Sequence, residues 1–194
     1  MKQKAEYKSA IRSRRLIKEA FTELMEEKEI DKITVTDIVK KADINRGTFY
    51  AHYANIRSLI EQIENDVLME GMGLLKEFSY KTFIQNPNPI LNKVNRLLEN
   101  EVKLYKKLIN NPDSEKFISK LRELFIEYLF YQSDIPDEIK NDKKFVLRIN
   151  FFAGGMINLY QLWLKEELDY TLDQIREEII DQTQAMLYLL NLSN

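Results

Sequence analysis

The sequence predicts an all-α protein in which a small N-terminal head of three helices, containing a helix-turn-helix, is joined to a larger helical body. Apolar residues recur at helical spacing along most of the chain, which is typical of amphipathic helices. Glycine and proline, which tight β-turns require, number only five and four among 194 residues. Apolar residues make up 44% of the chain, enough for a buried core. We place the head at residues 1–55 and the body at residues 56–194.

Each helix of the head follows from a local signal. Residues 9–28 carry apolar side chains at the spacing of one helix face. Thr34 is followed three residues later by Asp37, the form of a capping box, and this predicts a short helix through about Ala42. Asn45 is a good N-cap for a second short helix over residues 46–53. Two short helices joined by such a turn form a helix-turn-helix.

Longer helices are expected in the body. Asn55 can cap a helix that runs from Ile56 toward Ser79. Asn86-Pro87-Asn88-Pro89 is the strongest helix-breaking segment of the chain. Beyond it the apolar spacing predicts helices at about 90–109, 114–131, 137–166 and 171–191. The chain contains no internal repeat and no low-complexity segment.

The second helix of the predicted helix-turn-helix carries the candidate DNA-binding residues. A recognition helix brings polar side chains to the bases while its back packs on the other helices, and Phe49 and Tyr53 can form that back. Arg46 can donate two hydrogen bonds to guanine or to a phosphate, and Gly47 lets the backbone approach the duplex closely. The full set of DNA-binding candidates is Thr34, Thr36, Asn45, Arg46, Gly47, Thr48, Tyr50, Ala51, His52, Asn55 and Arg57.

The charge distribution supports a DNA-facing head. The net charge of the chain is −2, yet residues 1–60 contain 13 Lys and Arg against 9 Asp and Glu. The rest of the chain holds 16 basic and 22 acidic residues. A basic head on an acidic body is typical of a protein with one nucleic-acid-binding end. Arg12, Arg14 and Arg15 are either a solvated helix face or a fringe of phosphate contacts, and the sequence leaves both possibilities open.

The stretch from Ile11 to Leu59 resembles the DNA-binding head of the TetR/AcrR family of bacterial regulators. The matching motifs are TVTDIV and ADINRGTFYAHY, followed by a short link and Leu59. Two positions depart from the family pattern. Asp43 replaces the usual turn glycine, and Asp tolerates the left-handed conformation better than most residues. Ile56 replaces the usual lysine, which removes one expected phosphate contact unless Arg57 supplies it.

The resemblance implies a homodimer that binds a palindromic double-stranded DNA operator. It further implies repression of transcription, with release by a small-molecule effector bound in the body. The effector and its binding residues are unknown, because the aromatic residues of the body can be either core or pocket lining. An alternative is a co-regulator of the same family that is controlled by a protein partner. A helix-turn-helix that binds no DNA is a further, weaker alternative.

The resemblance also locates a dimer interface in the body. FFAGGMINLYQLW at 151–163 and the helix after it are similar to the last two helices of such proteins, which dimerise. Gly154 and Gly155 would allow a close helix–helix approach. The candidate interface residues are Met156, Tyr160, Trp163, Ile179, Thr183, Met186 and Leu190. The alternative is that these two stripes close the core of a single chain.

Several other classes of function are not expected. The chain lacks the Gly-x-Ser-x-Gly, Walker, dinucleotide-binding and His-Glu-x-x-His motifs, so it is not expected to be an enzyme. It contains no cysteine and a single histidine, His52, and no metal or cofactor is predicted. No apolar run approaches the ~20 residues of a membrane span, and the N-terminus does not have the pattern of a signal peptide. We therefore expect a cytoplasmic protein without membrane contact.

Overall fold

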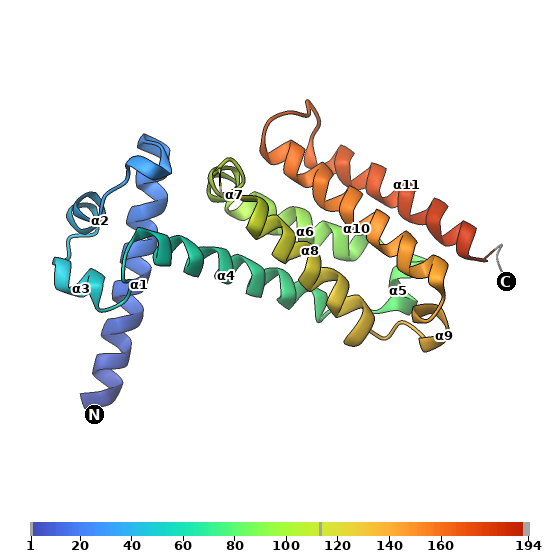
Figure 1. The fold of residues 1–194 in the computed structure, drawn as a ribbon, viewed down its shortest axis with the longest axis horizontal. Helices are drawn as coiled ribbons and strands as arrows, with labels where there is room; N and C mark the ends of the chain where they lie inside the picture. Colours follow the sequence, from blue (N-terminus) through green and yellow to red (C-terminus); the bar gives the residue numbers. More distant parts are fainter. Residues whose placement is uncertain (1, 113, 192–194) are drawn as a thin grey trace. The chain divides into compact units, whose positions relative to one another are not determined.

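Helices are the only regular secondary structure in the part of the chain that the structure describes, which confirms the predicted all-α class. The structure is a computed structural model that describes residues 2–112 and 114–191, with the side chains of 2–8, 187 and 189–191 left out. The chain divides into two compact units, residues 1–67 and 68–194 (Figure 1). The division falls within α4 (Ile56–Leu75), which contributes residues to both units.

The first unit packs the long helix α1 and several shorter helices around one apolar core. It contains α1 (Lys2–Glu27), η1 (Ile30–Lys32), α2 (Val35–Lys41), α3 (Arg46–Tyr50) and the first part of α4. One large side chain from each of the four α-helices is completely buried, and these residues are Phe21, Ile38, Phe49 and Leu59. Burying a side chain of this size contributes about 1.5–3 kcal/mol, so the core holds the short α2 and α3 in place.

Two helices of this unit differ in length from the sequence prediction. α1 begins at Lys2 rather than at residue 9, because residues 2–8 contain no glycine or proline to end it. α3 ends at Tyr50 rather than at residue 53. The Ala51 N–H donates to the carbonyl groups of Gly47 and Phe49, which closes the last turn.

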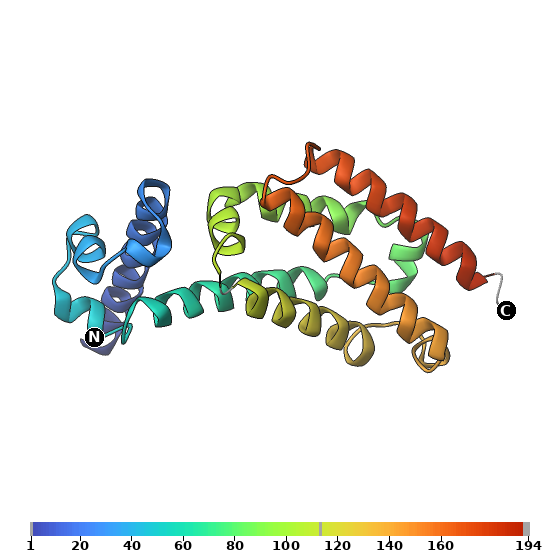
Figure 2. The same cartoon turned by 45° about the horizontal axis from the view of Figure 1, so that its top comes forward.

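The second unit is a helical bundle whose two longest helices lie side by side. After the end of α4 come α5 (Tyr80–Gln85), α6 (Asn88–Asn100), α7 (Val102–Ile109), α8 (Ser114–Tyr131), α9 (Asp137–Lys140), α10 (Lys143–Leu164) and α11 (Leu172–Asn191). α10 packs against α7, α8 and α11, and α11 also packs against α6 (Figures 1 and 2).

Two predicted helices of the body are each divided in the structure, and α5 was not predicted. The predicted helix at 90–109 is interrupted at Glu101, whose backbone (φ −133°, ψ 39°) is not helical. The predicted helix at 137–166 is split into α9 and α10, because the Asp142 side chain accepts a hydrogen bond from the Lys144 N–H at 2.9 Å and starts a new helix. Neither break involves glycine or proline, so the usual breaker residues do not reveal them.

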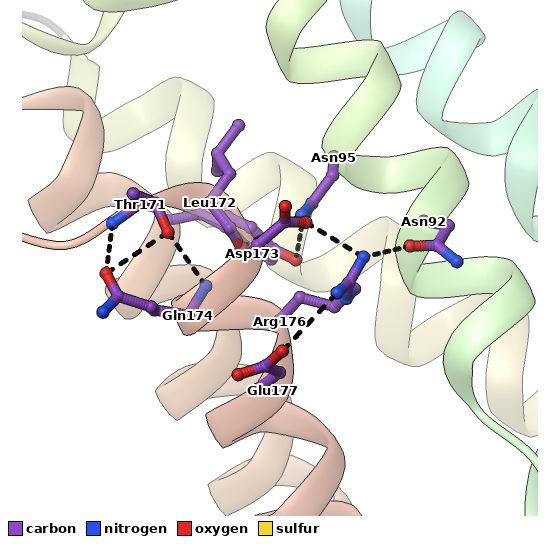
Figure 3. Close-up of polar contacts among 9 residues, drawn as sticks. Asn92, Asn95, Thr171, Leu172, Asp173, Gln174, Arg176 and Glu177 are labelled. Carbon is purple, nitrogen blue, oxygen red and sulfur yellow. Dashed lines mark hydrogen bonds and ion pairs between the residues drawn. The ribbon is translucent and has the colours of Figure 1, made fainter.

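A buried polar network joins α6, α10 and α11. Asn95 is 4% exposed; its Nδ2 donates to the Leu172 carbonyl at 3.0 Å and its Oδ1 accepts from the Tyr160 hydroxyl at 3.1 Å. Burial raises the pKa of Tyr160, so its hydroxyl stays protonated as a donor. Nearby, Arg176 donates to Asn92 and pairs with Asp173 at 3.0 Å (Figure 3). These bonds satisfy the polar atoms of Asn95 and Tyr160, whereas Arg176 Nε is buried without a hydrogen-bond partner among the described residues.

Three of the seven residues predicted to form the dimer interface, Tyr160, Ile179 and Thr183, are buried in the core of one chain. Tyr160 and Ile179 are buried in a cluster with Leu91, Leu172 and Ile175, and Met156 and Trp163 pack against it. Thr183 is completely buried and donates to the Ile179 carbonyl at 2.6 Å. Met186 is partly buried, and the Leu190 side chain lies outside the described residues. This packing favours the alternative interpretation, in which the stripes close the core of a single chain.

Candidate nucleic-acid interface

α2 begins with the predicted capping box, which the structure confirms. Thr34 Oγ1 accepts a hydrogen bond from the Asp37 N–H at 3.2 Å, and Asp37 Oδ2 accepts from the Thr34 N–H at 2.9 Å. The ammonium group of Lys28 lies 2.9 Å from the same carboxylate. The hydrogen bond from Lys28 and those from Thr34 lower the pKa of Asp37 from 3.8 to about 2. The carboxylate is thus ionised at neutral pH and fixes the start of α2.

The turn between α2 and α3 depends on Asp43. Its φ is 51°, in the left-handed region that glycine adopts most easily. The following Ile44 N–H donates to the Val39 carbonyl at 3.0 Å, which closes the end of α2. The expectation that Asp can occupy the family's glycine position is therefore confirmed.

α3 begins at Asn45, as predicted. Asn45 Oδ1 accepts hydrogen bonds from the Thr48 N–H at 2.8 Å and from the Thr48 hydroxyl at 3.1 Å. A Cβ added at Gly47 would lie 3.2 Å from this same oxygen, which is closer than most carbon–oxygen contacts. Gly47 therefore leaves room for the cap as well as for an approaching ligand. The side chains of Asn45 and Thr48 are already engaged in capping.

The two sides of α3 differ in the way a recognition helix requires. Phe49 is completely buried and Tyr53 is 8% exposed, with their ring centroids 5.8 Å apart. On the other side Arg46, Gly47 and Ala51 are exposed, and Tyr50 is 54% exposed. The ring of Tyr50 meets that of Phe49 edge to face at 5.5 Å, which holds it in place. The outer side of α3 is thus exposed, and the buried aromatic side chains of Phe49 and Tyr53 hold it in place from behind.

His52 lies at the end of this surface and is partly buried. Burial lowers the pKa of His52, and the positive charge of Arg14 on α1 lowers it further. The imidazole is therefore neutral at pH 7 and offers one N–H donor and one acceptor. Arg14 was left undecided by the sequence, and its proximity to His52 and Tyr53 is apparent only in the fold.

Arg46 and Thr36 connect the two helices of the motif. Arg46 Nη2 donates to Thr36 Oγ1 at 2.6 Å, and both residues are exposed. This bond uses one of the five N–H donors of the guanidinium group. The structure thus brings together Thr36, Arg46, Gly47, Tyr50 and Ala51 on one exposed surface of α2 and α3.

The remaining predicted residues act at the start of α4. Asn55 Oδ1 accepts from the Ser58 N–H at 2.9 Å, so Asn55 caps α4 as expected. Arg57 is exposed, and its Nε donates to Glu61 at 3.3 Å within the same helix. Thr34, Asn45 and Asn55 therefore share one structural role, which is to begin the three helices of the motif.

Comparisons with known proteins match both units. Residues 17–63 match the family model described as "Bacterial regulatory proteins, tetR family". Residues 85–186, more than half of the chain, match a second model described as "Transcriptional regulator C-terminal region" of TetR type. The match thus extends from the helix-turn-helix into the helical body.

Three curated relatives are similar to this chain. It is 38% identical over 66 residues to the HTH-type transcriptional regulator YxbF of Bacillus subtilis (strain 168), and 37% identical over 60 residues to YvdT of the same organism. These matches cover 33% and 31% of this chain, but only 17% and 31% of the two relatives. A 29% identical match covers 75% of the chain and 77% of the dhaKLM operon transcriptional activator DhaS of Lactococcus lactis.

Solved structures share the fold. A transcriptional regulator from Aquifex aeolicus VF5 superposes with a TM-score of 0.65 at 18% identity, covering 90% of this chain and 99% of that one. The dihydroxyacetone kinase operon activator DhaS gives a TM-score of 0.66 at 20% identity, with 93% and 97% covered. A TetR regulator from Streptococcus agalactiae 2603V gives 0.59 at 21% identity, with 93% and 98% covered. The chain therefore belongs to the TetR family of DNA-binding transcriptional regulators, which are not enzymes.

Proposed function

We propose that this regulator binds a palindromic DNA operator as a homodimer, with α3 of each chain in the major groove. The observation that carries this proposal is the exposed surface of α2 and α3, in which Thr36 orients Arg46 beside Gly47 and Tyr50. A two-fold dimer presents two such helices to half-sites about 34–36 Å apart, or one turn of B-DNA. The operator is then a pseudo-palindrome.

Within this surface the residues have different roles. Arg46 has free donors for guanine or for a phosphate, and Tyr50 presents a hydroxyl beside it. Gly47 and Ala51 permit a close approach of the helix to the bases. Thr34, Asn45 and Asn55 position the helices rather than reading bases, because their side chains are engaged as caps.

For the dimer we propose the outward face of α10 in place of the stripes that are buried. Leu147 is 73% and Phe151 is 86% exposed, although both are large and apolar. Gly154 follows at the next turn on the same face, and a Cβ added there would have nothing within 4 Å. Phe145 and Ile149, on the opposite side of α10, are buried in the bundle. A second copy packed on this face would cover the exposed apolar side chains.

The sign of regulation has two candidates. The resemblance of the head favours repression, which acts by blocking the promoter. The similarity to DhaS, which is named an operon activator and matches over 75% of this chain, favours activation. A reporter gene under a promoter that carries the operator separates the two, because removal of the regulator raises expression in the first case and lowers it in the second.

Two buried side-chain nitrogens of the body, Arg148 Nη1 on α10 and Arg176 Nε, have no hydrogen-bond partner among the described residues, and the first supports control by an effector. An unpaired buried donor costs about 1–3 kcal/mol, which an anionic effector would recover by accepting its hydrogen bond. Arg148→Met is then expected to raise the melting temperature of the free protein and to abolish its response to the effector. If a protein partner controls the regulator instead, Arg148→Met should leave the response to that partner unchanged.

Binding-site selection from random duplex DNA at a stated salt concentration tests the proposal. The purified protein is expected to enrich an inverted repeat whose two arms are one helical turn apart. Enrichment of a single, non-repeated motif would contradict the dimeric operator. No enrichment at all would contradict DNA recognition by this chain alone and would favour a co-regulator that needs a protein partner.

A further inference from the structure

Five of the ten Lys and Arg residues whose side chains are described in the first unit form ion pairs with carboxylates of the same unit. The ion pairs of its described residues are Arg15–Glu19, Lys18–Asp66, Lys28–Asp37, Lys41–Glu23, Lys41–Glu27 and Arg57–Glu61. No ion pair is found within this described part for Arg12, Arg14 or Arg46, nor for Lys32 and Lys40 on η1 and α2. An exposed cation without an internal partner is the group that can neutralise a DNA phosphate.

Arg14 lies beside the C-terminal end of the recognition helix. It sits on α1 three residues before Ile17 and seven before Phe21, so it continues the stripe by which α1 packs into the core. Its positive charge interacts electrostatically with the side chains of His52 and Tyr53, which follow α3. Arg14 itself is exposed. Its guanidinium group therefore lies within electrostatic range of His52 and remains open to solvent.

Arg46 occupies the opposite end of the same segment. It is the first residue of α3, which ends at Tyr50, two residues before His52. The major groove is about 12 Å wide between its two phosphate backbones. Arg46 and Arg14 lie toward the two ends of the segment that would enter this groove.

The rest of α1 strengthens this arrangement. Residues 1–15 contain six Lys and Arg and one Glu, and α1 is helical from Lys2 onward. Figure 1 shows that α1 continues past α3 toward its N-terminus. The backbone of the turns that precede Arg14 therefore continues past the recognition helix.

We propose that Arg14 is a second DNA contact of each head, which binds a backbone phosphate just outside the half-site read by α3. This inference rests on the proposed function, because it needs α3 in the major groove. The partner is the phosphate backbone of duplex DNA, so the contact contributes affinity and register but no base preference.

The test compares two neighbouring arginines. Arg14→Ala removes the proposed contact, whereas Arg15→Ala removes a side chain that is ion-paired with Glu19 and lies about 100° further around α1. Fluorescence anisotropy on the selected operator, measured over a range of salt concentrations, gives the slope of log K against log salt. We expect Arg14→Ala to weaken binding several-fold and to reduce the slope by about 0.9 for each bound head. Arg15→Ala and Arg14→Lys should retain the wild-type slope.

The result can overturn the inference without affecting the proposed function. If the wild-type protein binds its operator and Arg14→Ala has the same affinity and slope, the second contact does not exist. An equal loss in Arg15→Ala would show a general effect of head charge instead. A duplex trimmed to the palindrome should bring the wild type and Arg14→Ala to equal affinity; a persistent difference would contradict a contact outside the half-site. Failure of the wild type to bind any duplex would instead contradict the proposed function.

Discussion

Arg46 Nη2 lies 2.6 Å from the Thr36 hydroxyl and donates a hydrogen bond to it, so a side chain of α2 sets the direction of a side chain of α3. Immobilising a flexible side chain on binding costs about 0.5–1.5 kcal/mol, and a residue that is already oriented avoids part of this cost. The hydrogen bond thus connects the two helices of the motif. It fixes the orientation of the Arg46 side chain before DNA binds.

Removing the Thr36 hydroxyl should weaken DNA binding without unfolding the head. Thr36→Ala leaves Arg46 in place but free to rotate, so we expect a loss of about 2- to 10-fold in operator affinity. Thr36→Ser keeps the hydroxyl and should bind like the wild type. Anisotropy titration measures the affinity, and thermal unfolding checks the fold. Equal binding by the Ala and Ser variants would show that the hydrogen bond does not orient Arg46.

The cap of α2 should stabilise the first unit. Thr34→Ala removes the oxygen that accepts from the Asp37 N–H and should lower the free energy of unfolding by about 1 kcal/mol. Thr34→Ser preserves that acceptor and is the matched control. Chemical denaturation followed by circular dichroism measures both variants. A Thr34→Ala protein as stable as Thr34→Ser would contradict the capping role.

The Asp37 carboxylate should make this stability dependent on pH. Its pKa is lowered from 3.8 to about 2 in the folded chain by the hydrogen bonds from Lys28 and Thr34. The stabilisation is therefore fully present above pH 4 and is lost as the pH falls toward 2. Asp37→Asn should be less stable at neutral pH and should show a smaller loss between pH 4 and 2. Parallel acid-unfolding curves for the two proteins would contradict this linkage.

Asp43 should accept glycine but not a β-branched residue. Its φ of 51° strains any residue that has a Cβ, and the strain is about 1–2 kcal/mol for most of them. We expect Asp43→Gly to be at least as stable as the wild type and Asp43→Val to be less stable by about that amount. Denaturant unfolding compares the two. If Val is tolerated as well as Gly, the turn adopts another conformation in solution.

The outward face of α10 should control the oligomeric state. Phe151→Glu places a charge on an exposed apolar side chain, so it should leave the fold intact and dissociate the dimer. Tyr131→Glu on α8, where the side chain is 83% exposed, is the control and should remain dimeric. Sedimentation velocity at micromolar concentration measures the state of each protein. A dimer that persists in Phe151→Glu would place the interface elsewhere.

The head could be predicted from the sequence because its signals are local. Thr34 with Asp37 and Asn45 with Thr48 are capping patterns within four residues, and the structure contains both. The inward positions of Phe49 and Tyr53 follow from helical spacing in the same way. The Arg46–Thr36 bond and the position of Arg14 could not be predicted, because they depend on how α1, α2 and α3 pack together.

The body was harder to predict because its signals are ambiguous. Glu101 interrupts a segment with continuous apolar spacing, and no glycine or proline marks the break. The spacing of Tyr160 and Ile179 correctly identifies an apolar stripe but does not tell whether the same chain or a second copy covers it. Leu147 and Phe151, four residues apart and opposite the buried face of α10, are a signal of a second apolar face that the sequence contains and that we missed.

The affinity of the Arg46→Ala, Tyr50→Ala double variant for the selected operator tests most directly whether α3 reads the DNA. Both residues are exposed, so the variant should fold like the wild type. Tyr131→Ala, far from α3 in the sequence, serves as the control. Our account predicts a loss of about 10- to 100-fold in the double variant and none in the control. Wild-type affinity in the double variant would contradict recognition through α3.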